Sequence, residues 1–314
     1  MRRFEFTDIL GLVVVLLWAA NLPLAKDALR DFSPMSFNAV RIPLSALLLW
    51  IPTLLLQRRI HLQLRDIWKI LALGIIGNVF YLTLFIHGLE LTKAGNVGLL
   101  MSVGTIFTAL LSRLLGHEHL GRIVWAGILL SFGGVAVILL ESAEFAVGTG
   151  TLPGDLITLA AAACWSLYTV FSKSLMRSYS PLTFTTLTLS VGAVVLFFLS
   201  LPSLAEQEWG QISPKSYLEL GYSSIFSLAV AYSIWFYCVD RLGSTRTAIY
   251  ANLVPFWTLL FAWMFIGEEI TLLQVLGGIL ILTGIYLTRN STRSFRTVEA
   301  YTDKRDRSYT PESS

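Results

Sequence analysis

Charged side chains are scarce in this sequence. Asp, Glu, Lys and Arg make up 14% of its 314 residues, whereas an average soluble domain carries about 25%. Since polar side chains must cover the surface of a protein that folds in water, this chain has too little polar surface to be an ordinary soluble protein. Apolar residues account for 55% of the chain, and its mean hydropathy is +0.68.

The sequence also lacks the patterns that support several kinds of chemistry. Its two cysteines, Cys164 and Cys238, lie inside apolar runs, so we expect neither a disulfide nor a metal site from them. There is no G-x-x-x-x-G-K-[ST] motif to hold ATP phosphates, and no His and Glu residues have metal-ligand spacing. We therefore expect no enzyme activity and no cofactor. With a net charge of only +3, we also expect no nucleic-acid partner.

What the sequence does contain is long apolar runs. There are ten, each of about 16–23 residues, close to the length that a helix needs to cross a hydrocarbon core of about 30 Å. The predicted fold class is an all-α polytopic membrane protein with ten transmembrane helices, and the lipid bilayer is its first partner. The runs are 9–25, 35–56, 68–89, 97–115, 123–140, 156–176, 182–201, 217–239, 247–266 and 272–287.

Lys and Arg residues are distributed unevenly between the two sides of these spans. Eighteen fall on the side of both termini, four fall on the opposite side, and Arg41 lies inside a span. Because Lys and Arg collect in cytoplasmic loops, this bias predicts a bacterial inner-membrane protein with both termini in the cytoplasm. No Asp or Glu lies near the middle of a span, so we expect no carboxylate proton relay.

Two segments of the chain resemble each other residue by residue. Residues 16–37 match 163–184 at an offset of 147, and later parts of the two halves match at an offset of 151. Five spans separate each segment from its copy, so the halves have opposite orientations, as in many secondary transporters. The matched pairs are Asp8 with Asp155, Trp18 with Trp165, Lys26 with Lys173, Arg30 with Arg177, Ser33-Pro34 with Ser180-Pro181, Gly116-x-Glu118 with Gly267-x-Glu269, Gly127 with Gly278, and Gly133 with Gly284.

These matches divide the chain into five parts. We predict a cytoplasmic N-terminus at 1–7, a first five-helix repeat at 8–141, an external linker at 142–154 and a second, inverted repeat at 155–288. Residues 289–314 are charged and rich in Ser and Thr, which predicts a disordered cytoplasmic tail. A monomer is the simplest oligomeric state, although the pattern leaves that state open.

Most of the repeated residues are explained by helix structure alone. Ser33-Pro34 and Ser180-Pro181 are typical of helix starts, and Thr271-x-x-Gln274 is typical of a capping box. Acidic residues suit helix N-termini and lysines suit C-termini, which accounts for Asp8, Asp155, Lys26 and Lys173. The paired glycines predict close approaches between helices.

Trp18 and Trp165 are harder to explain in this way. Each lies ten residues after the Asp that starts its helix, about 15 Å along the helix and half-way across the hydrocarbon core. Since Trp normally favours the membrane interface, the pair indicates a cavity lined by indoles, with Asn21 and Tyr168 as polar neighbours. Packing of both indoles between helices is the alternative.

Other polar and aromatic residues in mid-span can face the same space. Asn78 and Tyr81 are three residues apart and so predict one helix face. Pro255 matches Gly104, and broken helices at matched positions indicate a transport site, a purely mechanical kink being the alternative. Further candidates are Tyr232, Trp235, Tyr237, Tyr250, Asn252 and Trp257.

Arg41 is the one charge placed well inside a span. An intramembrane Arg is costly and is a functional hypothesis by default. It could bind a substrate carboxylate or close a gate. It could equally cap carbonyl groups of a neighbouring helix from a position about 10 Å below the interface.

Taken together, the residues resemble the EamA type of the drug/metabolite transporter superfamily. The resemblance rests on Trp in spans one and six, G-x-E at the close of spans four and nine, Arg in span two and glycines in spans five and ten, and it covers about residues 8–288. It implies an exporter of amino acids or other metabolites, similar to an aromatic amino-acid exporter. It also implies that Trp18, Asn78, Tyr81 and Trp165 face a central cavity.

The sequence therefore predicts a secondary transporter that exports small amphipathic metabolites by alternating access. Aromatic or other hydrophobic amino acids are the leading substrates, because indole rings hold apolar or aromatic side chains by stacking. The predicted binding residues are Trp18, Asn21, Arg41, Asn78, Tyr81, Trp165, Tyr168 and Asn252. An exporter of cationic drugs or nucleoside-like metabolites is one alternative. A non-transporting scaffold or lipid-handling subunit is another.

Overall fold

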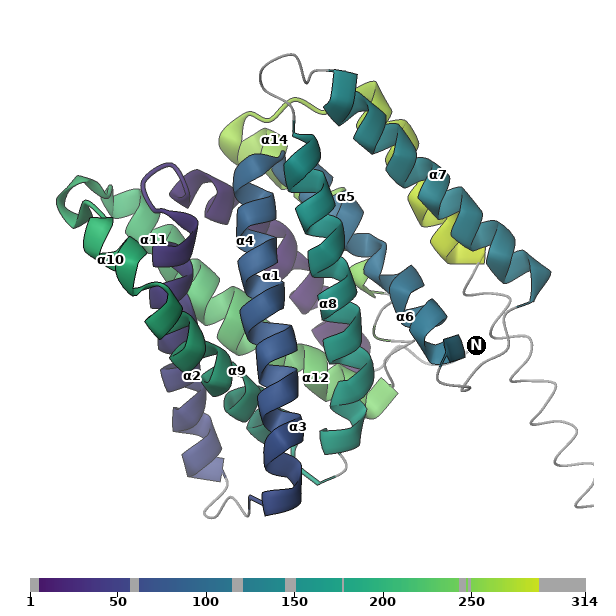
Figure 1. Ribbon diagram of the computed structural model, residues 1–314. Coiled ribbons are helices and arrows are strands. Elements are labelled where there is room, and N and C mark those ends of the chain that lie inside the picture. Colours follow the sequence, from purple (N-terminus) through teal and green to yellow (C-terminus); the bar gives the residue numbers. More distant parts are fainter. Residues whose placement is uncertain are drawn as a thin grey trace, which may run out of the picture.

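The computed structural model is all-helical over the residues that it describes, which are 6–56, 62–114, 121–144, 151–176, 178–242, 247 and 250–287. Figure 1 shows long helices packed side by side, with a further pair of helices along one flank. The predicted all-α class is confirmed for this part of the chain. The predictions for residues 1–5, Gly116-x-Glu118, Arg177, the linker residues 145–150 and the tail lie outside the described residues.

Six helical segments are long and apolar enough to cross a membrane. Together with shorter apolar helices, they make the chain a membrane-embedded, multi-pass protein. Four of the six are single helices, namely α1 (Phe6–Ala28), α2 (Pro34–Leu56), α8 (Leu152–Met176) and α9 (Pro181–Leu199). The shorter apolar helices are Ala94–Thr108, Trp125–Ile138, Val254–Ile266 and Leu272–Leu287.

The remaining two long segments each contain a π-helical stretch. In the first, α3 (Leu64–Gly74) continues through η1 (Ile75–Phe80) into α4 (Tyr81–Leu91). In the second, α11 (Pro214–Tyr222) continues through η3 (Ser223–Val230) into α12 (Ala231–Leu242). These stretches lie in the third and eighth apolar runs, which are matched positions of the two halves. The sequence analysis did not predict them, and π-helical stretches often mark functional sites.

Two shorter helices are broken where the sequence predicted. Helix α5 (Ala94–Ser102) ends at Val103, and α6 (Gly104–Leu114) follows directly. Helix α14 (Val254–Ile266) begins after a turn at residues 252–253 and carries Pro255 in its first turn. Pro lacks the backbone N–H that would continue a preceding helix, so the break belongs at this position.

The predicted helix starts are confirmed by hydrogen bonds. Ser33 Oγ accepts from the Ser36 backbone N–H at 3.3 Å, and Ser180 Oγ accepts from the Thr183 N–H at 3.2 Å. The two members of the predicted capping box also bond to each other. The N–H of Thr271 donates to Gln274 Oε1, and the N–H of Gln274 donates to Thr271 Oγ1, each at 3.1 Å.

Helix contacts in one half have counterparts in the other. Helix α1 packs against α14 and α12, whereas α8, its match in sequence, packs against α5, α6 and α4. Helix α2 packs against α9, which is its own match. The main apolar core lies between these helices and includes Phe37, Leu82, Tyr168 and Phe236.

The pair of helices on the flank, α7 (Arg122–Glu144) and Leu272–Leu287, shares a second apolar core with α5 and α6 (Figure 1). Glycines let the pair approach closely, because a Cβ on Gly134 would lie 2.5 Å from the carbonyl oxygen of Gly277. The predicted close approach is also found at Gly284, where an added Cβ would lie 2.3 Å from the carbonyl oxygen of Gly127. The prediction for Gly133 is wrong. Its neighbour Gly134 faces the other helix, and successive helical residues point about 100° apart, so Gly133 faces a different direction. No described atom lies within 4 Å of a Cβ built on Gly133.

Candidate functional site

A cavity of about 80 Å³ lies between the helices of the main core. Its lining comes from α1, α2, α4, α5, α8, η3, α12 and α14, so both halves contribute. Five of the eight predicted binding residues line it, and these are Trp18, Asn21, Arg41, Tyr81 and Trp165. This volume is well below the roughly 300–1,000 Å³ of most small-molecule sites, so the cavity as it stands is too small for a metabolite.

Aromatic rings form one side of the cavity. Trp18 and Trp165, the matched pair, meet edge to face with ring centroids 5.6 Å apart. Trp165 also contacts Tyr81 at 5.0 Å and Tyr232 at 5.3 Å. Rings in such tilted or edge-to-face contacts attract each other beyond simple burial. The alternative of packed indoles is therefore true in part, since the same rings pack together and border the cavity.

Arg41 is buried beside these rings. Its Nε donates to Asn38 Oδ1 at 2.9 Å, and its Nη1 donates to Ser223 Oγ at 2.8 Å. The guanidinium lies over the rings of Phe37 and Phe85, at 5.1 and 6.0 Å from their centroids. Within the described part of the chain, its Nη2 has no hydrogen-bond partner. Both hydrogen bonds that Arg41 makes to described residues go to side-chain oxygens, so the predicted alternative of capping backbone carbonyls is not found among them.

Asn21 lies one helical turn from Trp18 on α1. The indole Nε1 of Trp18 donates to the Ser227 carbonyl of η3 at 3.1 Å, which fixes this face of α1 against the π-helical stretch. Asn21 is 3% exposed, and its Oδ1 has no hydrogen-bond partner among the described residues. The described lining of the cavity includes no acidic side chain.

Three predicted binding residues do not line the cavity. The Tyr168 ring fits against Gly77, and its hydroxyl lies 2.7 Å from Thr188 Oγ1. Asn78 is fully buried against Gly192 of α9. Asn252 Oδ1 accepts a hydrogen bond from the Thr105 hydroxyl at 3.1 Å, so it joins the two broken helices.

The structure adds lining residues that the sequence analysis did not select. Phe85 follows Tyr81 by four residues on α4, so helical spacing alone could have identified it. Tyr232 was among the mid-span aromatic residues but was not chosen as a binding residue. Ser227 and the Arg41 partner Ser223 lie in η3, and nothing in the sequence pattern points to them.

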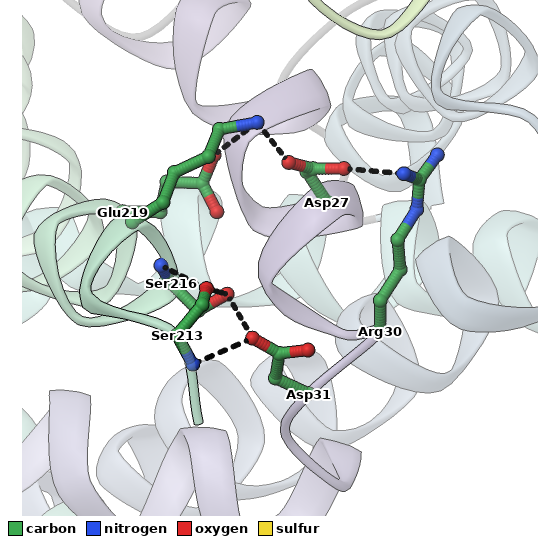
Figure 2. Close-up of polar contacts among 7 residues, drawn as sticks. Asp27, Arg30, Asp31, Ser213, Ser216 and Glu219 are labelled. Carbon is green, nitrogen blue, oxygen red and sulfur yellow. Dashed lines mark hydrogen bonds and ion pairs between the residues drawn. The ribbon is translucent and has the colours of Figure 1, made fainter. Parts of the chain in front are cut away.

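At the upper end of the bundle in Figure 1, the loop after α1 is bonded to the segment between α9 and α11. We call this the Asp31 end. Asp31 Oδ2 accepts from the Ser213 N–H at 2.9 Å and the Ser216 hydroxyl at 2.7 Å (Figure 2). These hydrogen bonds hold the pKa of the Asp31 carboxyl below its usual value of 3.8. Gln207, between α10 (Leu201–Glu206) and η2 (Trp209–Gln211), bonds to Asp31 O and to the Ser33 N–H, each at 2.9 Å.

Four charged side chains lie beside this contact. Asp27 pairs with Arg30 at 3.1 Å and with Lys215, and Lys215 also lies 3.7 Å from Glu219 (Figure 2). Because Arg30 and Lys215 are largely exposed, water screens these pairs. They position the end of α1 against α11 more than they stabilise the fold.

Comparison with known proteins identifies related sequences over both halves of the chain. The model of the EamA-like transporter family matches the chain twice, at residues 5–140 and 152–290. The chain is 30% identical to the uncharacterized transporter YdfC of Bacillus subtilis over 272 residues, which cover 87% of each protein. It is 27% identical to an uncharacterized transporter of Archaeoglobus fulgidus over 285 residues, or 90% of this chain and 96% of that one.

A solved structure has the same overall fold. It is a crystal structure of a protein that is 20% identical in sequence, and it superimposes with a TM-score of 0.66. The match covers 91% of this chain and 98% of the other. At this identity the similarity concerns the fold alone.

Proposed function

This chain belongs to the EamA-like transporter family and is a membrane transporter, and we propose that it exports small amphipathic metabolites by alternating access, with aromatic or other hydrophobic amino acids as the first candidates. The observation that carries the proposal is the cavity between the two halves, where Trp18 and Trp165 lie beside Arg41 and Asn21. Indole faces suit an apolar or aromatic side chain, and the polar groups suit the other end of an amino acid.

The small volume of the cavity fits a carrier in a closed arrangement. Sites for small molecules usually measure about 300–1,000 Å³, so the helices must separate before a substrate can enter the 80 Å³ space. The helix breaks supply places where they can bend. Ser102, at the end of α5, and Val254, at the start of α14, both line the cavity and both adjoin a break.

The proposal also includes the architecture, in which ten membrane-spanning helices form two inverted five-helix repeats. The double match to the family and the exchanged packing of α1 and α8 support the repeat. On the charge bias of the sequence, the Asp31 end faces outward in a bacterial inner membrane, with both termini in the cytoplasm. One copy of the chain is sufficient for this mechanism.

Uptake into proteoliposomes tests the proposal. Purified protein is reconstituted and offered a panel of radiolabelled amino acids with and without a pH gradient. We expect phenylalanine or branched-chain amino acids to enter. Entry without a gradient would indicate an uncoupled carrier. If no amino acid enters under either condition, the amino-acid proposal is wrong, and cationic drugs and nucleoside-like metabolites become the next substrates to test.

Substitution of Trp165 connects transport to the cavity. Trp165→Ala removes the ring that contacts Trp18, Tyr81 and Tyr232, so uptake should be lost while the protein is still produced. Trp263→Ala is the matched control, because Trp263 on α14 is 58% exposed and does not line the cavity. Unchanged uptake by Trp165→Ala would remove Trp165 from the site.

A further inference from the structure

Arg41 carries a buried charge that no described residue balances. Its side chain is 1% exposed and lines the cavity. None of the ion pairs among the described residues includes it, and its Nη2 lacks a hydrogen-bond partner there. A buried charge without a counter-ion costs free energy. A ligand that brings a negative group into this cavity therefore gains a favourable partner.

Asn21 lines the same cavity and offers a complementary group. Its Oδ1 is an acceptor with no hydrogen-bond partner among the described residues. A buried acceptor left without a donor also costs free energy. An ammonium group has three N–H donors and no acceptor, so it can satisfy this oxygen.

The two polar groups lie at one depth, and the indoles lie deeper. Asn21 comes two helical turns before the end of α1, and Arg41 comes two turns after the start of α2. Each therefore lies about 10 Å from the Asp31 end. By the same count, Trp18 lies about 15 Å and Trp165 about 20 Å from that end. The two polar groups therefore lie nearer the Asp31 end than the two indoles, and the Phe85 ring lies beside Arg41 at the upper level.

We propose that the cavity binds a zwitterion in one orientation, with the carboxylate on Arg41, the ammonium on Asn21 Oδ1 and the side chain pointing toward Trp18 and Trp165. This inference rests on the proposed function and names the charge class of its substrate. An α-amino acid carries both charged groups on one carbon, next to its side chain. It therefore matches two polar groups at one level with aromatic rings beneath them.

Arg41 also determines what the cavity rejects. An amine without a carboxylate would bring a second positive charge next to an unbalanced guanidinium. The described lining has no acidic side chain to compensate. Indole rings alone would attract such a cation, so the exclusion of cations depends on Arg41.

Four ligands separate the role of charge from the role of the ring. Binding of phenylalanine, 3-phenylpropionate, phenethylamine and alanine is measured on the full chain in nanodiscs. We expect phenylalanine to bind most tightly, 3-phenylpropionate about 10-fold more weakly and phenethylamine about 100-fold more weakly. Phenethylamine binding as tightly as phenylalanine would overturn the charge assignment while leaving an aromatic transporter. Alanine binding as tightly as phenylalanine would remove the aromatic preference and support the charge assignment. No binding by any of the four would overturn both.

Asn21→Asp tests the polar level with little change in side-chain shape. A carboxylate at this position partly balances Arg41 and attracts an amine, so the affinity ratio of phenethylamine to 3-phenylpropionate should rise at least about 10-fold. Gln63→Glu is the matched control, because Gln63 precedes α3, is exposed and does not line the cavity, and its ratio should stay at the wild-type value. Equal ratios in the two variants would overturn the inference.

Discussion

Ser223 and Asn38 hold the Arg41 guanidinium from two different elements. Asn38 lies one turn earlier on α2, and its own Nδ2 donates to the Leu82 carbonyl of α4 at 3.0 Å. Ser223 lies at the start of η3 and accepts from Nη1. The two contacts use Nε and Nη1, so Nη2 is the guanidinium nitrogen left for a ligand.

Loss of the Ser223 hydroxyl should therefore weaken substrate binding. In Ser223→Ala the guanidinium loses a charge-assisted hydrogen bond, and we expect about a 10-fold weaker affinity for phenylalanine. The affinity for phenethylamine should not fall, which distinguishes mispositioned charge from general damage. Ser224→Ala is the control, since among the described residues the Ser224 hydroxyl bonds only to the Leu220 carbonyl on its own helix. A parallel loss for both ligands would contradict a positioning role.

Helical spacing predicted the lining residues where the helix is regular and failed where it is not. Trp18 and Asn21 lie three apart on α1 and share a face, as expected. Asn78 and Tyr81 are also three apart, but Asn78 lies in η1, where the wider π turn rotates it off the face of Tyr81. Tyr168 leaves the cavity because Gly77 opens a slot for its ring, a contact between distant residues that the pattern does not reveal.

Lys26 shows a similar limit. The sequence explained it by the C-terminus of its own helix, and it does lie in the last turn of α1. Its ammonium, however, donates to three carbonyl oxygens at the end of α4, those of Leu89, Glu90 and Thr92, each at 2.8 Å. A Lys ammonium does stabilise the carbonyl groups at a helix C-terminus here, but that helix is the neighbouring α4 and not α1. Sequence spacing cannot supply that partner.

At the level of elements, the contact between η1 and α8 depends on a missing side chain. A Cβ on Gly77 would overlap the Tyr168 ring, so Gly77→Ala must displace a ring that also stacks on Phe184. We expect a loss of about 1–3 kcal/mol in stability, visible as a lower Tm in detergent. Gly221→Ala on α11 is the control, because no described atom lies within 4 Å of its added Cβ. Equal Tm values for the two variants would contradict this account of the contact.

The contact between the loop after α1 and α11 should depend on the ionised form of Asp31. Hydrogen bonds to the carboxylate lower its pKa. Their stabilisation of the contact is therefore fully present at pH values above the usual pKa of 3.8, and it is lost as the pH falls through the lowered pKa. At pH 7, Asp31→Ala should speed amide hydrogen exchange in residues 213–217 relative to wild type. As the pH falls through the lowered pKa, the two proteins should converge. Glu208→Ala, an exposed change in the same region, should leave hydrogen exchange at residues 213–217 unaltered. If exchange there rose as much as in Asp31→Ala, the effect would not be specific to Asp31.

Sequence reasoning located the helices well and their irregularities in part. Each predicted apolar run overlaps at least one described helix, because apolar length is a property of the chain itself. The breaks near Gly104 and Pro255 were also predictable, since Gly and Pro weaken a helix locally. The stretch η3 contains neither Gly nor Pro, and the sequence analysis did not use Gly77 of η1 as a signal. In the structure, η1 packs against α9, and η3 packs against α1 and α2.

On the scale of the whole molecule, the exchange of packing partners bears on how the carrier moves. Helix α1 contacts α14 and α12, and α8 contacts α5, α6 and α4. If the two halves have inverted orientations, an arrangement open to one side becomes open to the other when the halves exchange conformations. This is why the orientation of the chain is the property of the whole molecule to measure first.

Labelling of single cysteines decides that orientation. Glu208 at the Asp31 end and Arg65 at the start of α3 are both exposed, and the helical segment from Leu64 to Leu91 separates the two ends by about 40 Å. In a background with Cys164 and Cys238 replaced by Ala, a membrane-impermeant maleimide should label Glu208→Cys in intact cells. Arg65→Cys should react only after permeabilisation, because the excess of Lys and Arg places its end in the cytoplasm. The background without cysteine should stay unlabelled. The reverse pattern would place both termini outside, and labelling of both sites in intact cells would mean that the charge bias does not orient this chain.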